Sequence, residues 1–553
     1  MPIISFIGIY LLLLSSIIGY GYFFANNIST YNKNANIGYL GIYGIFILTL
    51  ISYLTNLILP HNFIHNYIVI FLGLFFFVKY IFTIKKIKKD FDIKLLLFFI
   101  IISLFAIFYF KNHDDFPYYH LSFMNNITLN KVEFGLGNFD LAYNHVSSLF
   151  FFHSLFKLPF TGNYFYFIGP ASILIFINMI LIKNIYQIDK EKNLNFVKFL
   201  SLFIFIFINV FFYRLAEHGT DRSAIIIIFL IILLMFQILE NKVLDRIKFE
   251  NFIILLTLVV SIKSFYAIYA FLFFIIYFKF FSIKKIFLFI NEYKIIHLSI
   301  AFCLLIFFYN IAYTGCLVYP VVSTCFENAF WAMDMSRIEM AMNWYELWSK
   351  SGANPNYRVD NPDYYIQGFN WVLNWIDNYF FNKVSDAILG LITIIIITFI
   401  ILRPRKIIFK YSNAFNVIFI ALIIYFFEWF YNHPALRYGG YHLLALSFFI
   451  PTAILLSGQK FKFSKYKRQV HLLIIISIII FTTRNINRIN NEVENYNYNF
   501  VKSPTYRIQP DFYKLKKNKD KVFSKTDNCK VEVKSSKNCK EIKGYTFFYK
   551  KDF

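Results

Sequence analysis

Apolar runs long enough to cross a bilayer recur along this chain, separated by short polar stretches. An α-helix needs about 20 apolar residues to span the hydrocarbon core. A sliding window of that size predicts about fourteen spans. They lie near 2–24, 37–59, 62–84, 95–110, 164–186, 195–213, 222–239, 250–262, 264–282, 294–312, 384–402, 412–430, 439–457 and 469–483. We therefore predict an all-α polytopic membrane protein with about 12 to 14 transmembrane helices.

The segments between the spans divide the chain further. Residues 1–483 form the predicted transmembrane domain, with large loops at 111–162 and 313–383. Polar and apolar residues alternate within 126–160, which predicts short amphipathic helices lying in the membrane interface. Residues 484–553 are polar and mixed in composition. They predict a small extracytoplasmic α+β domain at the C-terminus.

Composition supports the membrane assignment and changes how the net charge is interpreted. Hydrophobic residues make up 58% of the chain and charged residues 16%, against about 25% charged in soluble domains. The net charge of +24 does not indicate a nucleic-acid partner. The many Phe, Tyr and Lys residues, with scarce Gly and Pro, are typical of mutational bias, and much of the lysine lies in short loops. The expected partner is the lipid bilayer.

Basic loops predict the orientation. Lys and Arg cluster within 85–89, 284–285, 403–406 and 460–468, all on one side of the predicted spans. That side is cytoplasmic by the positive-inside rule. The opposite face receives both large loops, 214–221, 432–439 and the C-terminal tail. The segment 2–24 lacks a basic n-region and a small-residue cleavage site, so no cleavable signal peptide is expected.

Four of the five cysteines form two close pairs on the side expected to be oxidising. Disulfides between Cys316 and Cys325 and between Cys529 and Cys539 fit this placement. Free thiols at all four positions are the alternative. No cysteine and histidine spacing indicates a zinc site.

The sharpest candidate for chemistry is the stretch from His113 to His120, directly after the fourth predicted span. It contains the adjacent carboxylates of Asp114 and Asp115. Such a pair can act as a general base toward a hydroxyl group, or hold a divalent cation such as Mg²⁺ or Mn²⁺. The alternative interpretation is a solvated acidic helix end.

Two further charged stretches suggest anion binding. The loop from Arg214 to Arg222 includes His218 and Asp221; Arg214 could meet an anionic group, and Asp221 could open a helix. A solvated connector is the alternative. Lys263 lies between two apolar runs, where a buried ammonium is costly and a phosphate is a natural partner. A lysine extending from a short span end is the alternative.

A fourth stretch, Glu428 to Gly440, contains His433 and Arg437. Arg437 follows a proline at the start of a predicted helix. A positive charge there is unfavourable beside the positive end of the helix dipole, unless an anion binds it. An interfacial anchor is the alternative. Five of the six tryptophans lie in the loop 313–383, which suits sugar faces or the membrane interface. We find no P-loop, GxSxG or HExxH motif, so ATP-driven transport and those hydrolase chemistries lack support.

Taken together, these stretches resemble the GT-C superfamily of glycosyltransferases that use polyprenyl-phosphate sugars. A family of bacterial GT-C-like membrane proteins is the closer resemblance. The motifs that carry it are Gly135-Leu-Gly-Asn138, Asn144-His-Val-Ser-Ser148, Thr220-Asp221, Ile262-Lys263, Thr314-Gly-Cys-Leu-Val-Tyr-Pro320 with Thr324-Cys325, Pro434-Ala-Leu-Arg437 and the tail with two cysteines. Typical GT-C enzymes place the acidic loop after the first span, whereas here it follows about the fourth.

The resemblance implies a site and a location. Asp114 or Asp115 would be the catalytic base, and Lys263 and Arg437 would lie near the lipid-phosphate leaving group, with Arg214 as a further phosphate ligand. His113, His120, His218, Asp221 and His433 would support them. The protein would then lie in a bacterial inner membrane and transfer a sugar on the periplasmic face. Its acceptor would be a glycan, a lipid or a protein.

Two other functions remain open from the sequence. A flippase for lipid-linked glycans would use Lys263 and Arg437 to line a path, but the charges gather at one face rather than through both leaflets. An O-antigen-type polymerase or ligase also uses extracytoplasmic arginines and a large loop. The acidic pair distinguishes this chain from the latter, because such enzymes need not carry it.

Overall fold

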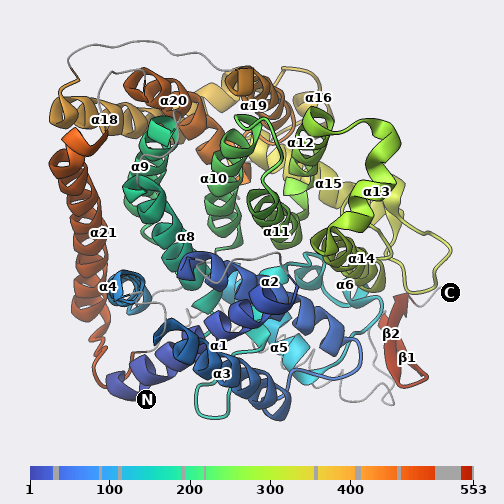
Figure 1. Ribbon diagram of the computed structural model, residues 1–553. Helices are drawn as coiled ribbons and strands as arrows, with labels where there is room; N and C mark the ends of the chain where they lie inside the picture. The colour runs from blue at the N-terminus through green and yellow to red at the C-terminus, as the bar shows by residue number, and fades with distance from the viewer. Residues whose placement is uncertain are drawn as a thin grey trace.

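The computed structural model describes residues 1–28, 36–85, 90–109, 115–187, 194–216, 219–353, 359–404, 413–457, 463–504 and 537–550. Within these ranges the chain is mostly helical and ends in a two-stranded hairpin (Figure 1). Among the described residues, ten helices are long and apolar enough to cross a membrane, or eleven if one bent pair counts as a span. The chain is therefore a multi-pass membrane protein whose spans contact a lipid bilayer.

The first helices pack closely through glycine. They are α1 (Ile3–Asn27), α2 (Ile37–Asn56), α3 (Phe63–Lys85) and α4 (Asp90–Ile107). Helix α1 packs on both α2 and α3 (Figure 1). A Cβ atom at Gly19 would lie 1.9 Å from the carbonyl oxygen of Gly73 in α3, and one at Gly44 would lie 1.9 Å from that of Ile17. These backbones approach so closely only because glycine has no side chain.

The first large loop folds into short elements that pack inside the protein. They are η1 (Phe116–His120), α5 (Leu121–Leu129), α6 (Leu136–Phe139), η2 (Leu141–Tyr143) and α7 (Ser148–Ser154). Every residue of α7 is buried, and α7 contacts α2, α5, α8 and α11. Short helices were expected here, and the structure shows that they help to form the core.

The middle of the chain surrounds a fully buried helix. Its elements are α8 (Ile168–Tyr186), α9 (Leu194–Phe211), α10 (Thr220–Leu239), α11 (Arg246–Ile262), η3 (Ser264–Ala270), α12 (Phe271–Phe280), η4 (Ile283–Lys285), α13 (Ile286–Glu292) and α14 (Lys294–Thr314). Helix α10 is buried continuously from Ser223 to Phe236. It packs against α8, α9, α11, α19 and α20. A helix that is apolar on all sides belongs in such a central position.

In the part of the chain that the structure describes, ten or eleven helices meet the requirements of a span, against the 12 to 14 that the sequence predicts. Helices α4, α9 and α11 form where spans were expected, but they do not meet the length and charge requirements of a span. Asp92 and Lys94 lie in the first turns of α4, and Arg246, Lys248 and Glu250 open α11. Helix α9 is apolar from Asn195 to Phe211, and this segment is shorter than a span requires. The segment expected at 264–282 instead belongs to a pair bent by 105°.

The C-terminal half contains the second large loop and the outer helices. Its elements are η5 (Val322–Thr324), α15 (Met335–Lys350), α16 (Pro362–Ile366), α17 (Val372–Trp375), η6 (Ile376–Val384), α18 (Ser385–Leu402), α19 (Asn413–Asn432), η7 (Leu436–Tyr438), α20 (Gly440–Ser457), η8 (Phe463–Tyr466) and α21 (Lys467–Tyr496). Helix α21 runs along one edge of the molecule and packs on α9 and α4 (Figure 1). Residue 484, the expected start of a C-terminal domain, lies inside α21.

The hairpin of β1 (Lys537–Ile542) and β2 (Tyr545–Lys550) is antiparallel. It joins the first large loop through backbone hydrogen bonds. The amide of Phe134 donates to the carbonyl of Thr546, and the amide of Phe548 donates to that of Phe134, each at 2.8 Å. Gly135 has φ +69°, and a Cβ there would lie 2.0 Å from the Phe548 carbonyl oxygen. The first glycine of the Gly-Leu-Gly-Asn motif is thus required for the tail to dock.

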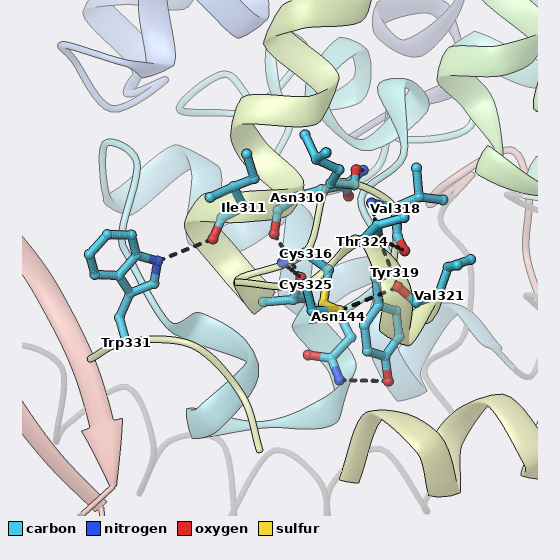
Figure 2. The surroundings of a disulfide bond; sticks show 12 residues. Asn144, Asn310, Ile311, Cys316, Val318, Tyr319, Val321, Thr324, Cys325 and Trp331 are labelled. Atoms are coloured by element: carbon cyan, nitrogen blue, oxygen red, sulfur yellow. Dashed lines mark hydrogen bonds between the residues drawn. A yellow bond between two sulfur atoms is a disulfide. The ribbon is translucent and has the colours of Figure 1, made fainter. Parts of the chain in front are cut away.

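The disulfide Cys316–Cys325 closes a short loop after α14 and confirms one expected pair (Figure 2). The loop is joined to the first large loop, because the Nδ2 of Asn144 donates to the hydroxyl of Tyr319 at 3.1 Å. Cys539 is also disulfide-bonded, whereas Cys529, its expected partner, lies outside the described residues. Among the described cysteines, Cys303 is a free thiol.

Candidate functional site

Four charged side chains from distant parts of the sequence meet in one network, which we call the four-residue cluster: Asp115, Asp221, Lys263 and Arg437. The ammonium of Lys263 forms a salt bridge with Oδ1 of Asp221. The guanidinium of Arg437 then joins the two carboxylates, donating from Nε to Asp221 Oδ2 at 2.9 Å and from Nη2 to Asp115 Oδ2 at 3.2 Å. The cluster alternates cation and anion and has no net formal charge.

The four-residue cluster is shielded but still reachable. The side chains of Asp221 and Lys263 are 12% and 24% exposed, and those of Asp115 and Arg437 are 28% and 36% exposed. Ion pairs in such surroundings interact more strongly than on an open surface, because the local dielectric constant is lower. A polar ligand could therefore reach groups whose electrostatic interactions are only partly screened by water.

Aromatic side chains fix the backbone that presents Arg437. The segment 434–437 follows α19 and has few intrahelical partners of its own. Its polar backbone groups are satisfied by hydrogen bonds from Trp375 to Pro434, from Trp429 to Ala435, from the Leu436 amide to Tyr379 and from Tyr266 to Arg437, at distances of 2.8 to 3.4 Å. These contacts hold the Pro-Ala-Leu-Arg motif in one conformation before any ligand arrives.

Lys263 occupies the break at the end of α11. Its backbone is extended, with φ −151° and ψ 120°, so the helix stops there and the ammonium turns toward Asp221. Serines of the first large loop hold this break. Ser147 Oγ donates to the carbonyl of Ile262 at 2.7 Å, and Ser261 Oγ donates to Ser148 Oγ at 2.9 Å. The Asn-His-Val-Ser-Ser and Ile-Lys motifs are therefore parts of one assembly.

The two carboxylates lie at helix beginnings. Asp221 is in the first turn of α10, where the helix dipole favours a negative charge. Asp115 directly precedes η1. Asp221 uses both of its oxygens in the cluster, whereas the contact described for Asp115 involves Oδ2.

Aromatic rings and a histidine surround the four-residue cluster. The ring of Tyr438 lies 4.4 Å from the Lys263 ammonium, and Trp348 of α15 lies 5.5 Å from the Arg437 guanidinium. His145 Nε2 is hydrogen-bonded to the hydroxyl of Tyr345, also in α15. The sequence interpretation gave Tyr438, Tyr345 and His145 no individual role, and it considered Trp348 only as one of the five tryptophans of the loop 313–383. His145 nevertheless lies within the Asn144–Ser148 motif, and Tyr438 directly follows the Pro434–Arg437 motif. These two motifs were the sequence signal that could have identified both residues.

Electrostatics set the protonation of two groups at the cluster. Burial lowers the pKa of His145 to about 4; the cations of Lys263 and Arg437 also lower it, while Asp115 and Asp221 act in the opposite direction. Burial alone would lower the pKa of Arg437, but Asp221 and Asp115 keep that pKa well above its ordinary value. His145 is thus neutral near pH 7, and Arg437 is charged.

The other predicted residues lie in different places. His433 is at the edge of the site: its ring contacts Tyr438 at 6.0 Å, and burial, followed by Lys350 and Lys263, lowers its pKa to about 4. His120 is buried, with its ring 4.9 Å from that of Phe150. Arg214 lies close enough to Arg222 and Arg488 to act on both as a like charge.

Three predicted residues, His113, Asp114 and His218, lie outside the described residues. The expectation of a divalent cation at Asp114 and Asp115 therefore stays a prediction. In the ranges that the structure describes, no group of three or more His, Cys, Asp or Glu side chains is arranged to hold a metal ion. The guanidinium of Arg437 lies between Asp115 and Asp221, so these two carboxylates already share a cation and do not fit a metal site between them.

A family model described as a domain of unknown function (DUF8201) matches residues 1–444. The chain belongs to this family. The matched stretch contains all four residues of the cluster and ends within α20. Neither the curated proteins nor the solved structures give a match.

Proposed function

We propose that this member of the family is a membrane glycosyltransferase of GT-C type. It would transfer a sugar from a polyprenyl-phosphate donor to a glycan, lipid or protein acceptor on the extracytoplasmic face of a bacterial inner membrane. The observation that carries the proposal is the four-residue cluster, because it joins two carboxylates and two cations in a partly exposed site of a multi-pass membrane protein.

The cations suit a lipid phosphate. Within the described residues, Lys263 has Asp221 as its single hydrogen-bond partner, although an ammonium carries three N–H groups. Arg437 uses Nε and Nη2 in the cluster, and its Nη1 forms no hydrogen bond within the same ranges. A phosphate oxygen could join both cations without breaking the network, and arginine binds phosphate well through parallel N–H groups.

The carboxylates suit different roles. Asp221 is bound through both oxygens and is the less exposed, so it positions Lys263 and Arg437. Asp115 is the more exposed carboxylate, and it lies next to Arg437 rather than beside Lys263. It is the better general base toward an acceptor hydroxyl, because a base needs to reach the proton that it accepts.

The proposed reaction inverts the anomeric carbon. The acceptor oxygen forms a bond to that carbon while the bond from the carbon to the phosphate oxygen breaks. The hydroxyl proton passes to the Asp115 carboxylate. The electron pair leaves with the polyprenyl phosphate, and Arg437 and Lys263 stabilise the charge that develops there.

The test is sugar transfer by the full-length protein in nanodiscs. Polyprenyl phosphates carrying radiolabelled hexoses are supplied with membrane extracts as acceptors, and release of polyprenyl phosphate is measured. Asp115→Asn should reduce transfer by about 10²- to 10⁴-fold, the usual contribution of a general base. Asp363→Asn, which changes an exposed carboxylate of the second large loop, is the matched control and should retain activity.

Full activity in both Asp114→Asn and Asp115→Asn would contradict the proposal, as would absence of transfer from every donor by the wild-type protein. The same assay separates the alternative functions. A flippase moves the lipid-linked sugar without releasing polyprenyl phosphate. A polymerase or ligase would require a donor that carries a glycan on pyrophosphate.

A further inference from the structure

A second group of charged side chains lies near the four-residue cluster but is built differently. Its members surround Tyr213, in the turn between α9 and α10. We call this group the arginine cluster: Arg214, Arg222, Arg484 and Arg488. Two come from the turn and the first residues of α10, and two come from the C-terminal half of α21.

Tyr213 is the common neighbour of the arginine cluster. The guanidinium of Arg484 lies 3.9 Å from the centre of its ring, and that of Arg488 lies 5.5 Å from it. Arg488 also lies 3.6 Å from the ring of Tyr109, at the end of the segment that follows α4. The junction of α4, α9 and α21 therefore gathers guanidinium groups from separate parts of the chain.

Neutral groups hold these arginines in place. Arg484 Nη1 donates to the carbonyl of Val210 at 2.9 Å, and Arg488 Nη1 donates to Oδ1 of Asn485 at 2.7 Å. Asn485 in turn donates to the carbonyl of Tyr213 at 3.2 Å. Carbonyls, amides and aromatic rings thus help to orient the guanidinium groups of Arg484 and Arg488.

The arginines repel one another. Arg214 acts on both Arg222 and Arg488 as a like charge. Within the part of the chain that the structure describes, neither Arg222 nor Arg484 forms a salt bridge. A bound anion would relieve this repulsion, and guanidinium groups are well suited to phosphate.

The position of the arginine cluster favours an anion carried by a lipid. Helices α4 and α21 both expose apolar side chains, for example Ile101 at 57% and Ile479 at 56%. Such surfaces face acyl chains in a multi-pass protein. The apolar run of α21 stops just before Arg484, and the side chain of Arg484 is exposed. Arginines placed at the end of a lipid-facing helix lie at the depth of lipid headgroups.

We propose that the arginine cluster is a second anion site, which binds the phosphate headgroup of a membrane lipid. Asp221 and Arg222 are adjacent in α10, so this lipid would lie beside the four-residue cluster without sharing its cations. The site does not depend on sugar transfer. Arg484 and Arg488 lie beyond residue 444, outside the stretch matched by the family model.

The test measures lipid binding to delipidated full-length protein in detergent. Dioctanoyl phosphatidic acid, dioctanoyl phosphatidylcholine and inorganic phosphate are titrated separately, and binding is followed by native mass spectrometry and thermal shift. Phosphatidic acid should bind saturably to the wild-type protein. Arg222→Gln and Arg488→Gln should each raise its Kd about tenfold, as expected when one charge-assisted hydrogen bond is lost.

Two controls make the result decisive. Arg468→Gln removes an exposed arginine from the opposite end of α21 and should leave the Kd within about twofold. Asp115→Asn should bind phosphatidic acid like wild type, which separates this site from the proposed glycosyltransferase site. If Arg488→Gln fails to fold, Arg484→Gln takes its place, because the side chain of Arg484 is exposed.

Equal affinities in Arg222→Gln, Arg484→Gln and Arg468→Gln would overturn the proposal. Equal binding of phosphatidylcholine would show that the acyl chains, rather than the headgroup charge, are recognised, and would also overturn it. Saturable binding of inorganic phosphate with the same dependence on the arginines would reassign the site to free phosphate.

Discussion

The four-residue cluster and the arginine cluster lie at the same end of α10, where Asp221 and Arg222 are neighbours in sequence, yet they are built from different contacts. In the first, two carboxylates join two cations through salt bridges. In the second, guanidinium groups contact tyrosine rings, a carbonyl and an amide. The number of positive charges is therefore a poor guide to what each region does.

The comparison shows that the partner of a charge determines its role. A cation that is already paired with a carboxylate is held in position and contributes to stability, because removing one partner leaves the other uncompensated. A cation held by neutral groups keeps its attraction for an external anion. The first arrangement suits chemistry on a bound ligand, and the second suits recruitment of a charged lipid.

The largest expected difference between the two clusters is in stability. Lys263→Met leaves Asp221 with Arg437 alone and should lower the free energy of unfolding by about 2 kcal/mol, less than the roughly 3–5 kcal/mol for a fully buried pair. Arg222→Gln should change it by less than about 0.5 kcal/mol, since it also relieves repulsion. Equilibrium unfolding in SDS mixed micelles measures both. Equal losses would remove the contrast.

A smaller effect concerns coupling between residues. Asp221→Asn and Lys263→Met remove the two ends of one ion pair, so their effects on the free energy of unfolding should fall short of additive by about 1 kcal/mol. Lys263→Met and Arg488→Gln belong to different clusters and should add to within about 0.5 kcal/mol. Strong coupling in the second pair would mean that the two clusters form one network.

The smallest expected effect is a pH dependence at the edge of the four-residue cluster. Burial, assisted by Lys263 and Arg437, lowers the pKa of His145 to about 4 in the folded protein, whereas the unfolded chain should titrate near 6.5. The unfolded state therefore binds more protons between these values, and stability falls as the pH drops. The contribution is roughly 0.7 kcal/mol between pH 7 and 6.

His145→Gln should reduce this fall when unfolding is compared at pH 7 and pH 6. His471→Gln, which changes an exposed histidine of α21, serves as the control and should leave the fall intact. A wild-type slope in the His145 variant would show that the histidine does not stay neutral beside the two cations.

Much of the fold followed from hydropathy alone, and the exceptions have physical causes. The runs that became α1, α2, α3, α8, α10 and α14 each contain a long, mostly apolar window, so their helices could be located directly. Helices α4 and α11, which form at the spans predicted near 95–110 and 250–262, begin with charged residues, which shorten the apolar window without preventing the helix. The chain bends by 105° between Phe280 and Ile283, and no periodicity in the sequence indicates this bend.

The candidate site was predicted in part. Asp115, Lys263 and Arg437 stood out because each is an ionisable residue at the edge of an apolar run, where charge is costly. Asp221 stood out for the same reason but was given only a supporting role, and the structure places it at the centre. Trp348 was noted only as one of five tryptophans in its loop, and Tyr438 was not identified, because aromatic residues are so frequent in this chain that their positions carry little information.

The sequence by itself determined that the chain spans a membrane many times, because a long apolar run has no stable alternative in water. It also determined which charged residues were unusual. Only the tertiary structure decided which of them meet, since Asp115, Asp221, Lys263 and Arg437 are separated by between 42 and 322 positions. Local sequence specifies the cost of a charge near the membrane, and long-range packing supplies the partner that offsets it.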